Sequence, residues 1–340
     1  MANPQPNKPQ SILELLQERK NSNPFRPTFS AEIIPPRNGS ELKGIHEQLT
    51  TLTQAKIDFV SVTKGAGGSL RGGTLPIAQW IKQEFNLTAI AHFTCRDYSV
   101  EEIENNLMDH HYFGIDNILA LRGDPPDGQP DYFTTQAAPH TTPRHQFAYQ
   151  LVEQIQRMNC GKYLTRKGFD QPTQEKKGAP TNFCIGIAAH PEHLPLEQSI
   201  EYLKRKVDAG GQYAITQMIF DAEIYARFLE ACAKAHIDIP ILPGFRILTS
   251  LAMLERMQKK FQVHVPTWTR EAFAREAFAR EAFAREAFDR DASVTAQSTI
   301  GLDCAETLSR QLLRYGAPGL HLFVMNDAVS SSRLIERLRS

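Results

Sequence analysis

The segment Phe29-Ser30-Ala31-Glu32-Ile33-Ile34-Pro35-Pro36-Arg37 places a carboxylate inside a short apolar run that two prolines close. Its length and composition predict a β-strand over Phe29–Ile34, and Glu is rarely buried without a partner. Because desolvation disfavours the anion, a buried Glu32 should keep its proton to an unusually high pH. Such a neutral acid suits general acid catalysis near neutrality. The alternative is that Glu32 faces solvent from an edge strand or pairs with Arg37.

Seven further apolar runs of strand length follow this one, and amphipathic stretches separate them. The eight runs are Phe29–Ile34, Ile57–Thr63, Leu87–Cys95, Asn117–Gly123, Phe183–His190, Tyr213–Gln217, Ile239–Gly244 and Gly319–Met325. Strand–helix alternation indicates parallel strands joined by crossover helices, so eight units predict a closed (β/α)8 TIM barrel of the α/β class. An open doubly wound sheet is the alternative, and the strand count favours the barrel.

The composition is that of an ordinary globular protein and argues against several classes of function. The chain has 340 residues, and its 38 Lys and Arg balance its 38 Asp and Glu, so no basic excess indicates binding of nucleic acid or an anionic membrane. No apolar run is long enough to span a membrane, and the polar, proline-rich N-terminus has no signal-peptide core. Five scattered cysteines predict reduced thiols. We therefore expect a cytoplasmic protein.

We expect an N-terminal extension with a short helix over residues 1–24 and a (β/α)8 catalytic barrel over residues 25–340. The polar segment 162–180 predicts a surface loop. Repeats of Arg-Glu-Ala-Phe-Ala between 270 and 289 predict a helical insertion over 268–290, ahead of the last strand. A five-residue step turns about 140° around a helix, so the four Phe residues of the repeats cannot share one face. The helix lies outside the barrel, or it contacts a partner or second subunit.

Polar side chains gather at the C-terminal ends of the predicted strands, where barrels of this class bind ligands. They are Glu32, Thr63, His92, Arg122, Gly123, Asp124, His190 and Gln217. Gly123 allows a ligand to approach the backbone, and two prolines fix Asp124 at the strand tip; a tight turn with a surface Arg–Asp pair is the alternative. The glycines between 65 and 73 fit neither the dinucleotide fingerprint nor the phosphate loop. His190 and His193 lack a third metal ligand at convincing spacing, so we expect no metal.

Several of these segments together resemble the methylenetetrahydrofolate reductase family over about residues 25–330. The matching stretches are Phe29–Arg37, Phe59–Gly65, His92–Asp97, Ala120–Pro126, Leu203–Gly210, Ala214–Asp221 and Ile241–Gly244. The resemblance implies a (β/α)8 barrel that holds FAD noncovalently at its C-terminal rim. NADH or NADPH would reduce the flavin and leave, and 5,10-methylenetetrahydrofolate would then be reduced to 5-methyltetrahydrofolate. This ping-pong reaction supplies methyl groups for methionine synthesis, and relatives usually form homo-oligomers.

The same resemblance implies a role for individual residues. Glu32 would protonate the imidazolidine ring of the folate, and the charge of Asp124 would favour a cationic intermediate. Gln217 matches a residue that hydrogen-bonds the pterin, and Leu251 stands where an aromatic side chain often packs on the substrate. The positions that match flavin contacts are Thr63, His92, Arg122, Gly123, Asp124, Ala148, Ala188, His190 and Lys206. His190 replaces a tyrosine of many members, and the repeat insertion is foreign to the family.

Two other functions remain open on the sequence alone. One is a barrel transferase or lyase that binds a pterin or a phosphorylated ligand without flavin, and the other is a barrel that has lost catalysis. A colourless protein that takes up no FAD would favour the first of these, and a yellow protein that does not react with folate would favour the second.

Overall fold

The computed structural model describes residues 11–65, 71–96, 98–125, 144–165, 174–192, 194–284 and 291–340. Eight parallel strands close into a barrel in the order β1-β10-β9-β8-β7-β4-β3-β2. They are β1 (Thr28–Ile33), β2 (Phe59–Val62), β3 (Thr88–Thr94), β4 (Asn117–Leu121), β7 (Cys184–Ala189), β8 (Tyr213–Met218), β9 (Ile241–Phe245) and β10 (Gly319–Met325). These strands coincide with the eight predicted runs to within a few residues, which confirms the (β/α)8 TIM barrel.

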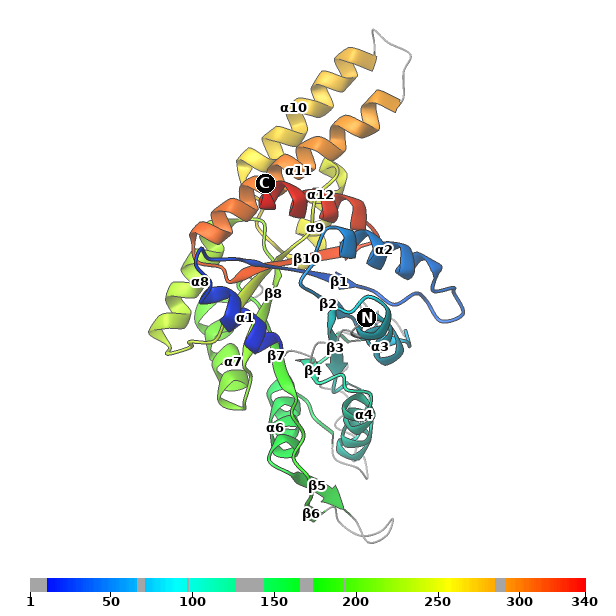
Figure 1. The fold of residues 1–340 in the computed structure, drawn as a ribbon. Coiled ribbons are helices and arrows are strands. Elements are labelled where there is room, and N and C mark those ends of the chain that lie inside the picture. The colour runs from blue at the N-terminus through cyan, green and yellow to red at the C-terminus, as the bar shows by residue number, and fades with distance from the viewer. Residues whose placement is uncertain are drawn as a thin grey trace.

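Helices lie around the barrel (Figure 1). They are α1 (Ile12–Lys20), α2 (Lys43–Gln54), α3 (Thr74–Glu84), α4 (Val100–Tyr112), α6 (Ala148–Asn159), α7 (Leu196–Asp208), α8 (Ala222–Lys234), α9 (Leu251–Phe261), α10 (Thr267–Ala284), α11 (Asp291–Arg314) and α12 (Ala328–Arg339). Side chains alternate along each strand. In β1, Phe29, Ala31 and Ile33 therefore pack outward in the main core between barrel and helices, which leaves Ser30 and Glu32 facing the interior.

The half of the barrel interior nearer the N-terminal ends of the strands, which we call the lower half, is apolar, and helix α1 closes it. A second core fills this half, and it combines inward side chains of six strands with three residues of α1. The strand residues come from β2, β3, β4, β7, β8 and β9 and are Phe59, Ile90, Leu119, Cys184, Tyr213, Ile215 and Leu242; the α1 residues are Ile12, Leu15 and Leu16. The buried amide of Ile12 donates to Asn117 Oδ1 at 2.9 Å, and Arg19 pairs with Asp58 at 2.6 Å. With its N-terminal end plugged in this way, the barrel offers its C-terminal rim to ligands.

The polar segment that we expected to be a loop contains a small antiparallel hairpin. Strands β5 (Lys162–Thr165) and β6 (Gln174–Lys177) pair with each other outside the barrel and project from the molecule (Figure 1). Arg157 of α6 contacts Glu175 at 2.5 Å, and the amide of Leu164 donates to Glu104 at 2.9 Å. Because the side chains of β6 are exposed, no alternation of apolar and polar residues marked this hairpin in the sequence.

The helical insertion predicted ahead of the last strand corresponds to α10 as far as Ala284, and α11 follows it at Asp291. Helices α10 and α11 run side by side and extend well beyond the barrel (Figure 1). Phe273, the first phenylalanine of the repeats, is only 4% exposed and packs at the base of α10. Residues 285–290, which complete the repeats, lie outside the described ranges.

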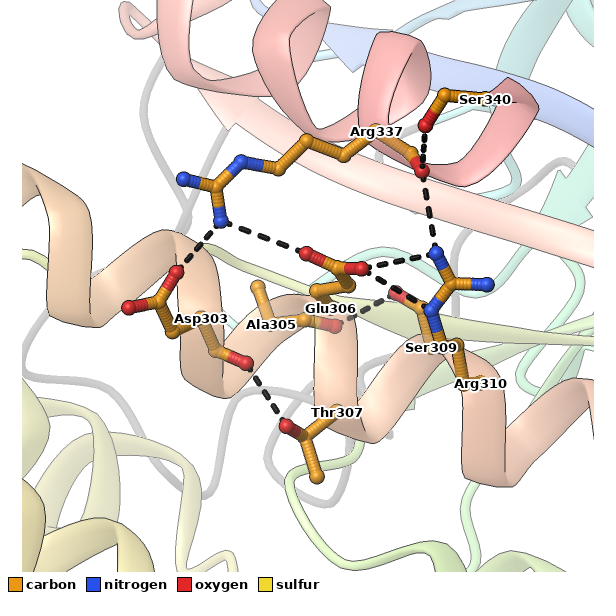
Figure 2. A network of polar contacts seen from close by, with 8 residues as sticks. All are labelled: Asp303, Ala305, Glu306, Thr307, Ser309, Arg310, Arg337 and Ser340. Carbon is orange, nitrogen blue, oxygen red and sulfur yellow. Dashed lines mark hydrogen bonds and ion pairs between the residues drawn. The ribbon is translucent and has the colours of Figure 1, made fainter.

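The barrel end of α11 is tied to the C-terminal helix α12 by a network of ion pairs (Figure 2). Arg337 contacts Asp303 at 2.6 Å and Glu306 at 3.4 Å, while Arg310 reaches Glu306 at 2.8 Å. These side chains are partly exposed, so each pair adds little to stability, but together they orient α12. In the part of the chain that the structure describes, no helix is long and apolar enough to cross a membrane.

Candidate active site

Glu32 lies inside the barrel on β1, between Phe323 of β10 and Ser61 of β2 in the strand register. Its side chain is 13% exposed, and burial raises the pKa of its carboxyl from 4.5 to about 8. The inward position follows from the alternation along β1, which sends its apolar neighbours outward. The expectation that Glu32 is buried is confirmed, and the alternative of a solvent-facing Glu32 is wrong; burial favours the protonated form of the acid.

His92 of β3 contacts this acid. Its Nε2 lies 3.6 Å from Glu32 Oε2, and burial lowers the pKa of the imidazole to about 3. Burial therefore favours the neutral forms of both groups, a carboxylic acid beside an imidazole, over an ion pair. A charged imidazole there would lower the pKa of Glu32, so the desolvation of His92 helps to keep the acid protonated.

A second buried histidine, His321 of β10, was not among the predicted site residues. Its Nδ1 lies 2.8 Å from the hydroxyl oxygen of Ser30, two residues before Glu32, and the Ser30 hydroxyl donates to the carbonyl of Leu320 at 3.1 Å. A hydroxyl has one proton, so His321 Nδ1 must donate to Ser30, which leaves Nε2 as an acceptor. Burial and the nearby His92 lower the pKa of His321 to about 3.

Polar atoms without partners cluster in this part of the barrel. Among the described residues, the buried side-chain atoms with no hydrogen-bond partner include Ser61 Oγ, Thr63 Oγ1, His92 Nε2 and His321 Nε2. Buried polar atoms in folded proteins are nearly always satisfied by protein or by water. The polar atoms in the upper half of the barrel interior can therefore be satisfied by a polar ligand or by ordered water.

The tips of β3 and β4 are held against each other beside this interior. Gly123 has φ +92°, and a Cβ there would lie 3.0 Å from Cβ of Arg96. The Arg96 amide donates to the Arg122 carbonyl at 2.9 Å, and its guanidinium donates to the carbonyl of Asp124. Asp124 itself is exposed at the strand tip. Arg96 therefore also helps to fix the backbone of Asp124. The sequence alone had attributed this role to the two prolines that follow Asp124.

Two of the residues selected from the sequence, Lys206 and Ala188, contact each other. The Lys206 ammonium donates to the Ala188 carbonyl, and burial lowers the pKa of Lys206 to about 8. Gln217 is half-buried on β8, and its Oε1 accepts from the amide of Met218 at 2.9 Å. His190 and Ala148 are half-buried after β7 and at the start of α6. Asp97, Pro126 and His193 lie outside the described residues.

Leu251 begins α9, which packs on the rim through a separate apolar group that we name the rim cluster. The rim cluster consists of Met218, Phe220, Leu248, Met253, Leu254, Met257, Val263, Val265 and Phe273, with Leu251 and Phe323 packed against it. Phe323 reaches the barrel interior, because a Cβ on Gly244 would come within 2.5 Å of its ring. Leu251 and the barrel mouth are therefore joined by continuous packing, and Phe323 is a mouth residue that sequence reasoning missed.

Comparison with known proteins agrees with this geometry. A sequence model of the methylenetetrahydrofolate reductase family matches residues 17–339. The chain is 29% identical over 315 residues to 5,10-methylenetetrahydrofolate reductase of Escherichia coli (strain K12), with 91% of this chain and 90% of the relative covered. It is also 29% identical to methylenetetrahydrofolate reductase (NADH) 1 of Arabidopsis thaliana, of which it covers 48%.

Among solved structures, an uncharacterised Clostridium thermocellum protein that binds two copies of 5-methyl-5,6,7,8-tetrahydrofolic acid aligns with a TM-score of 0.52. The alignment covers 95% of this chain and 99% of that one, and the identity of 15% makes it a likeness of fold alone. The match to the family model runs through nearly the whole barrel, and the E. coli relative is aligned over most of its own length. The chain therefore belongs to the methylenetetrahydrofolate reductase family.

Proposed function

We propose that this chain reduces 5,10-methylenetetrahydrofolate to 5-methyltetrahydrofolate with NAD(P)H, through FAD and in ping-pong order, and so supplies methyl groups for methionine synthesis in the cytoplasm. Family membership and the names of the relatives support reduction of a folate. The observation that carries the proposal is the position of Glu32, which is 13% exposed inside the upper barrel with His92 Nε2 at 3.6 Å, where burial raises the pKa of the carboxyl to about 8. Ring opening of the folate needs such an acid.

The side chains at the rim suit a bound flavin nucleotide. Thr63 Oγ1 and His92 Nε2 are buried without partners among the described residues, so both are available to a ligand with donors and acceptors. Gly123 carries no side chain where a ligand would approach the strand tip. The residues that would hold FAD are Thr63, His92, Arg122, Gly123, Asp124, Ala148, Ala188, His190 and Lys206. When bound, FAD supplies hydride transfer, which no protein side chain provides.

Glu32 would give its proton to the imidazolidine ring of the folate, which then opens to an iminium cation. Transfer of the proton creates a carboxylate and a cation together, and their attraction in a desolvated site offsets the cost of the buried anion. Asp124 would add a second negative charge near the cation, while Gln217 and Leu251 would contact the pterin and the rest of the substrate. The neutral His92 and His321 add no positive charge that would oppose the cation.

The test is anaerobic reduction of the purified protein. We expect a yellow protein that NADH or NADPH bleaches and that methylenetetrahydrofolate turns yellow again, with 5-methyltetrahydrofolate as the product. A colourless protein that takes up no FAD would favour a flavin-free barrel that binds a pterin or a phosphorylated ligand. A yellow protein that the folate does not reoxidise would favour a barrel without this catalysis.

A further inference from the structure

A group of polar contacts at the rim, outside the site described above, centres on His264 in the connection between α9 and α10. The His264 amide donates to Glu192 Oε1 at 2.6 Å, and its Nδ1 lies 3.1 Å from Asp221 Oδ2. Glu192 follows β7, and Asp221 caps α8 by accepting from the amide of Glu223 at 2.9 Å. One residue thus joins the α9–α10 connection to the loops after β7 and β8.

The groups that face His264 are mainly acidic. Burial raises the pKa of Glu192, and Asp221 raises it further, while the His264 amide, the His264 side chain and Arg227 lower it. Glu192 Oε2 is buried with no hydrogen-bond partner in the described chain. Nearby, Glu223 accepts from the Tyr315 hydroxyl. A positive charge on His264 would therefore be favoured by two carboxylates from two different loops.

The contacts of His264 are continuous with the barrel mouth. Its neighbours Val263 and Val265 are buried in the rim cluster, which also holds α9 and reaches Phe323. The Phe323 ring lies 5.4 Å from the ring of His321, edge to face, inside the barrel. A change in how firmly the α9–α10 connection is held would therefore be felt at α9, whose first residue, Leu251, is the proposed substrate contact.

We propose that His264 is a positioning residue that fastens α9 against the barrel mouth, and that it does so more firmly when its imidazole is charged. The His264 side chain is 57% exposed, so it can be replaced without disturbing the packed core. The effect on substrate binding rests on the proposed function. Partly exposed ion pairs are weak, so we expect a change of about two- to fivefold in the KM for methylenetetrahydrofolate.

The kinetic test compares wild type, His264→Arg and His264→Gln in the FAD-loaded protein. Arg keeps a positive charge beside the two carboxylates and Gln does not, so at one pH the KM for methylenetetrahydrofolate should be about two- to fivefold higher in His264→Gln than in His264→Arg. Glu32 is common to both variants, so its protonation cancels in this ratio. The kcat and the rate of flavin reduction by NAD(P)H should be unchanged in both variants. His236→Arg, at an exposed histidine between α8 and β9, is the matched control.

A second measurement does not depend on catalysis. Hydrogen exchange of the peptide covering residues 262–266, expressed as a protection factor, should be lower in His264→Gln than in wild type and in His264→Arg. Equal protection in all three proteins, or equal KM values for the Arg and Gln variants, would overturn the inference. A protein whose protection shifts as expected but which reduces no folate would refute the proposed function and leave the role of His264 in holding the connection intact.

Discussion

Glu32 makes a prediction about stability as well as about catalysis. Burial raises its folded-state pKa from 4.5 to about 8, so its contribution to stability is complete below pH 4.5 and is lost as the pH rises through 8. Between pH 4.5 and pH 7 the Glu32 carboxyl ionises in the unfolded chain but stays protonated in the native protein. At 1.36 kcal/mol per pH unit, the roughly 2.5 pH units in this range lower the free energy of unfolding of the wild type by about 3 kcal/mol at pH 7. Glu32→Gln keeps the shape of the side chain and removes this cost.

The assay is urea unfolding of wild type and Glu32→Gln with equal flavin content. The variant should exceed the wild type in free energy of unfolding by under about 1 kcal/mol at about pH 5 and by about 3 kcal/mol at about pH 7. Glu47→Gln on the exposed face of α2 removes a surface carboxylate and serves as the control. A difference between Glu32→Gln and wild type that stays constant over this range would refute the idea that the fold holds Glu32 neutral.

Three further predictions concern the strand tips and the buried lysine. Asp124→Asn should slow reoxidation of the reduced flavin by the folate about 10²–10³-fold in rapid-mixing experiments and make the flavin potential less negative, because a negative charge near the cation is lost; an unchanged rate would contradict its role. Lys206→Met should weaken FAD binding at least about tenfold in an equilibrium titration, the value of one hydrogen bond from a charged group, and equal affinities would remove Lys206 from the flavin site. Gly123→Ala should lower the free energy of unfolding by about 1–3 kcal/mol, because φ is +92° and the new Cβ would lie 3.0 Å from Arg96 Cβ and 3.3 Å from Thr94 Cβ; undiminished stability would show that the tip relaxes freely.

The barrel and its central acid were predictable from the sequence because burial leaves a strong local pattern. Strands covered on both sides read as continuous apolar runs, and each of the eight appeared within a few residues of its place. Glu32 stood out because it interrupts such a run. Strand alternation already placed Ser30 on the same face, which was the available signal for its part in the site.

The remaining features depend on contacts between distant segments. Ser30 and His321 are 291 residues apart, and only the register of β1 against β10 brings them together. Phe323 lies in the mouth because Gly244 of the neighbouring strand leaves room for its ring. The sequence around either residue does not indicate that the two lie side by side. The β5–β6 hairpin was missed for the opposite reason, since β6 is exposed along its whole length and β5 is only partly buried.

The most direct test of the central claim separates the two half-reactions in Glu32→Gln. The purified variant is reduced anaerobically with NAD(P)H, and the reduced protein is then mixed rapidly with methylenetetrahydrofolate while the flavin absorbance is followed. We predict bleaching at the wild-type rate and almost no return of the yellow colour, because only the second step consumes the proton of Glu32. Equal loss in both steps, or reoxidation at the wild-type rate, would contradict the assignment of Glu32 as the acid.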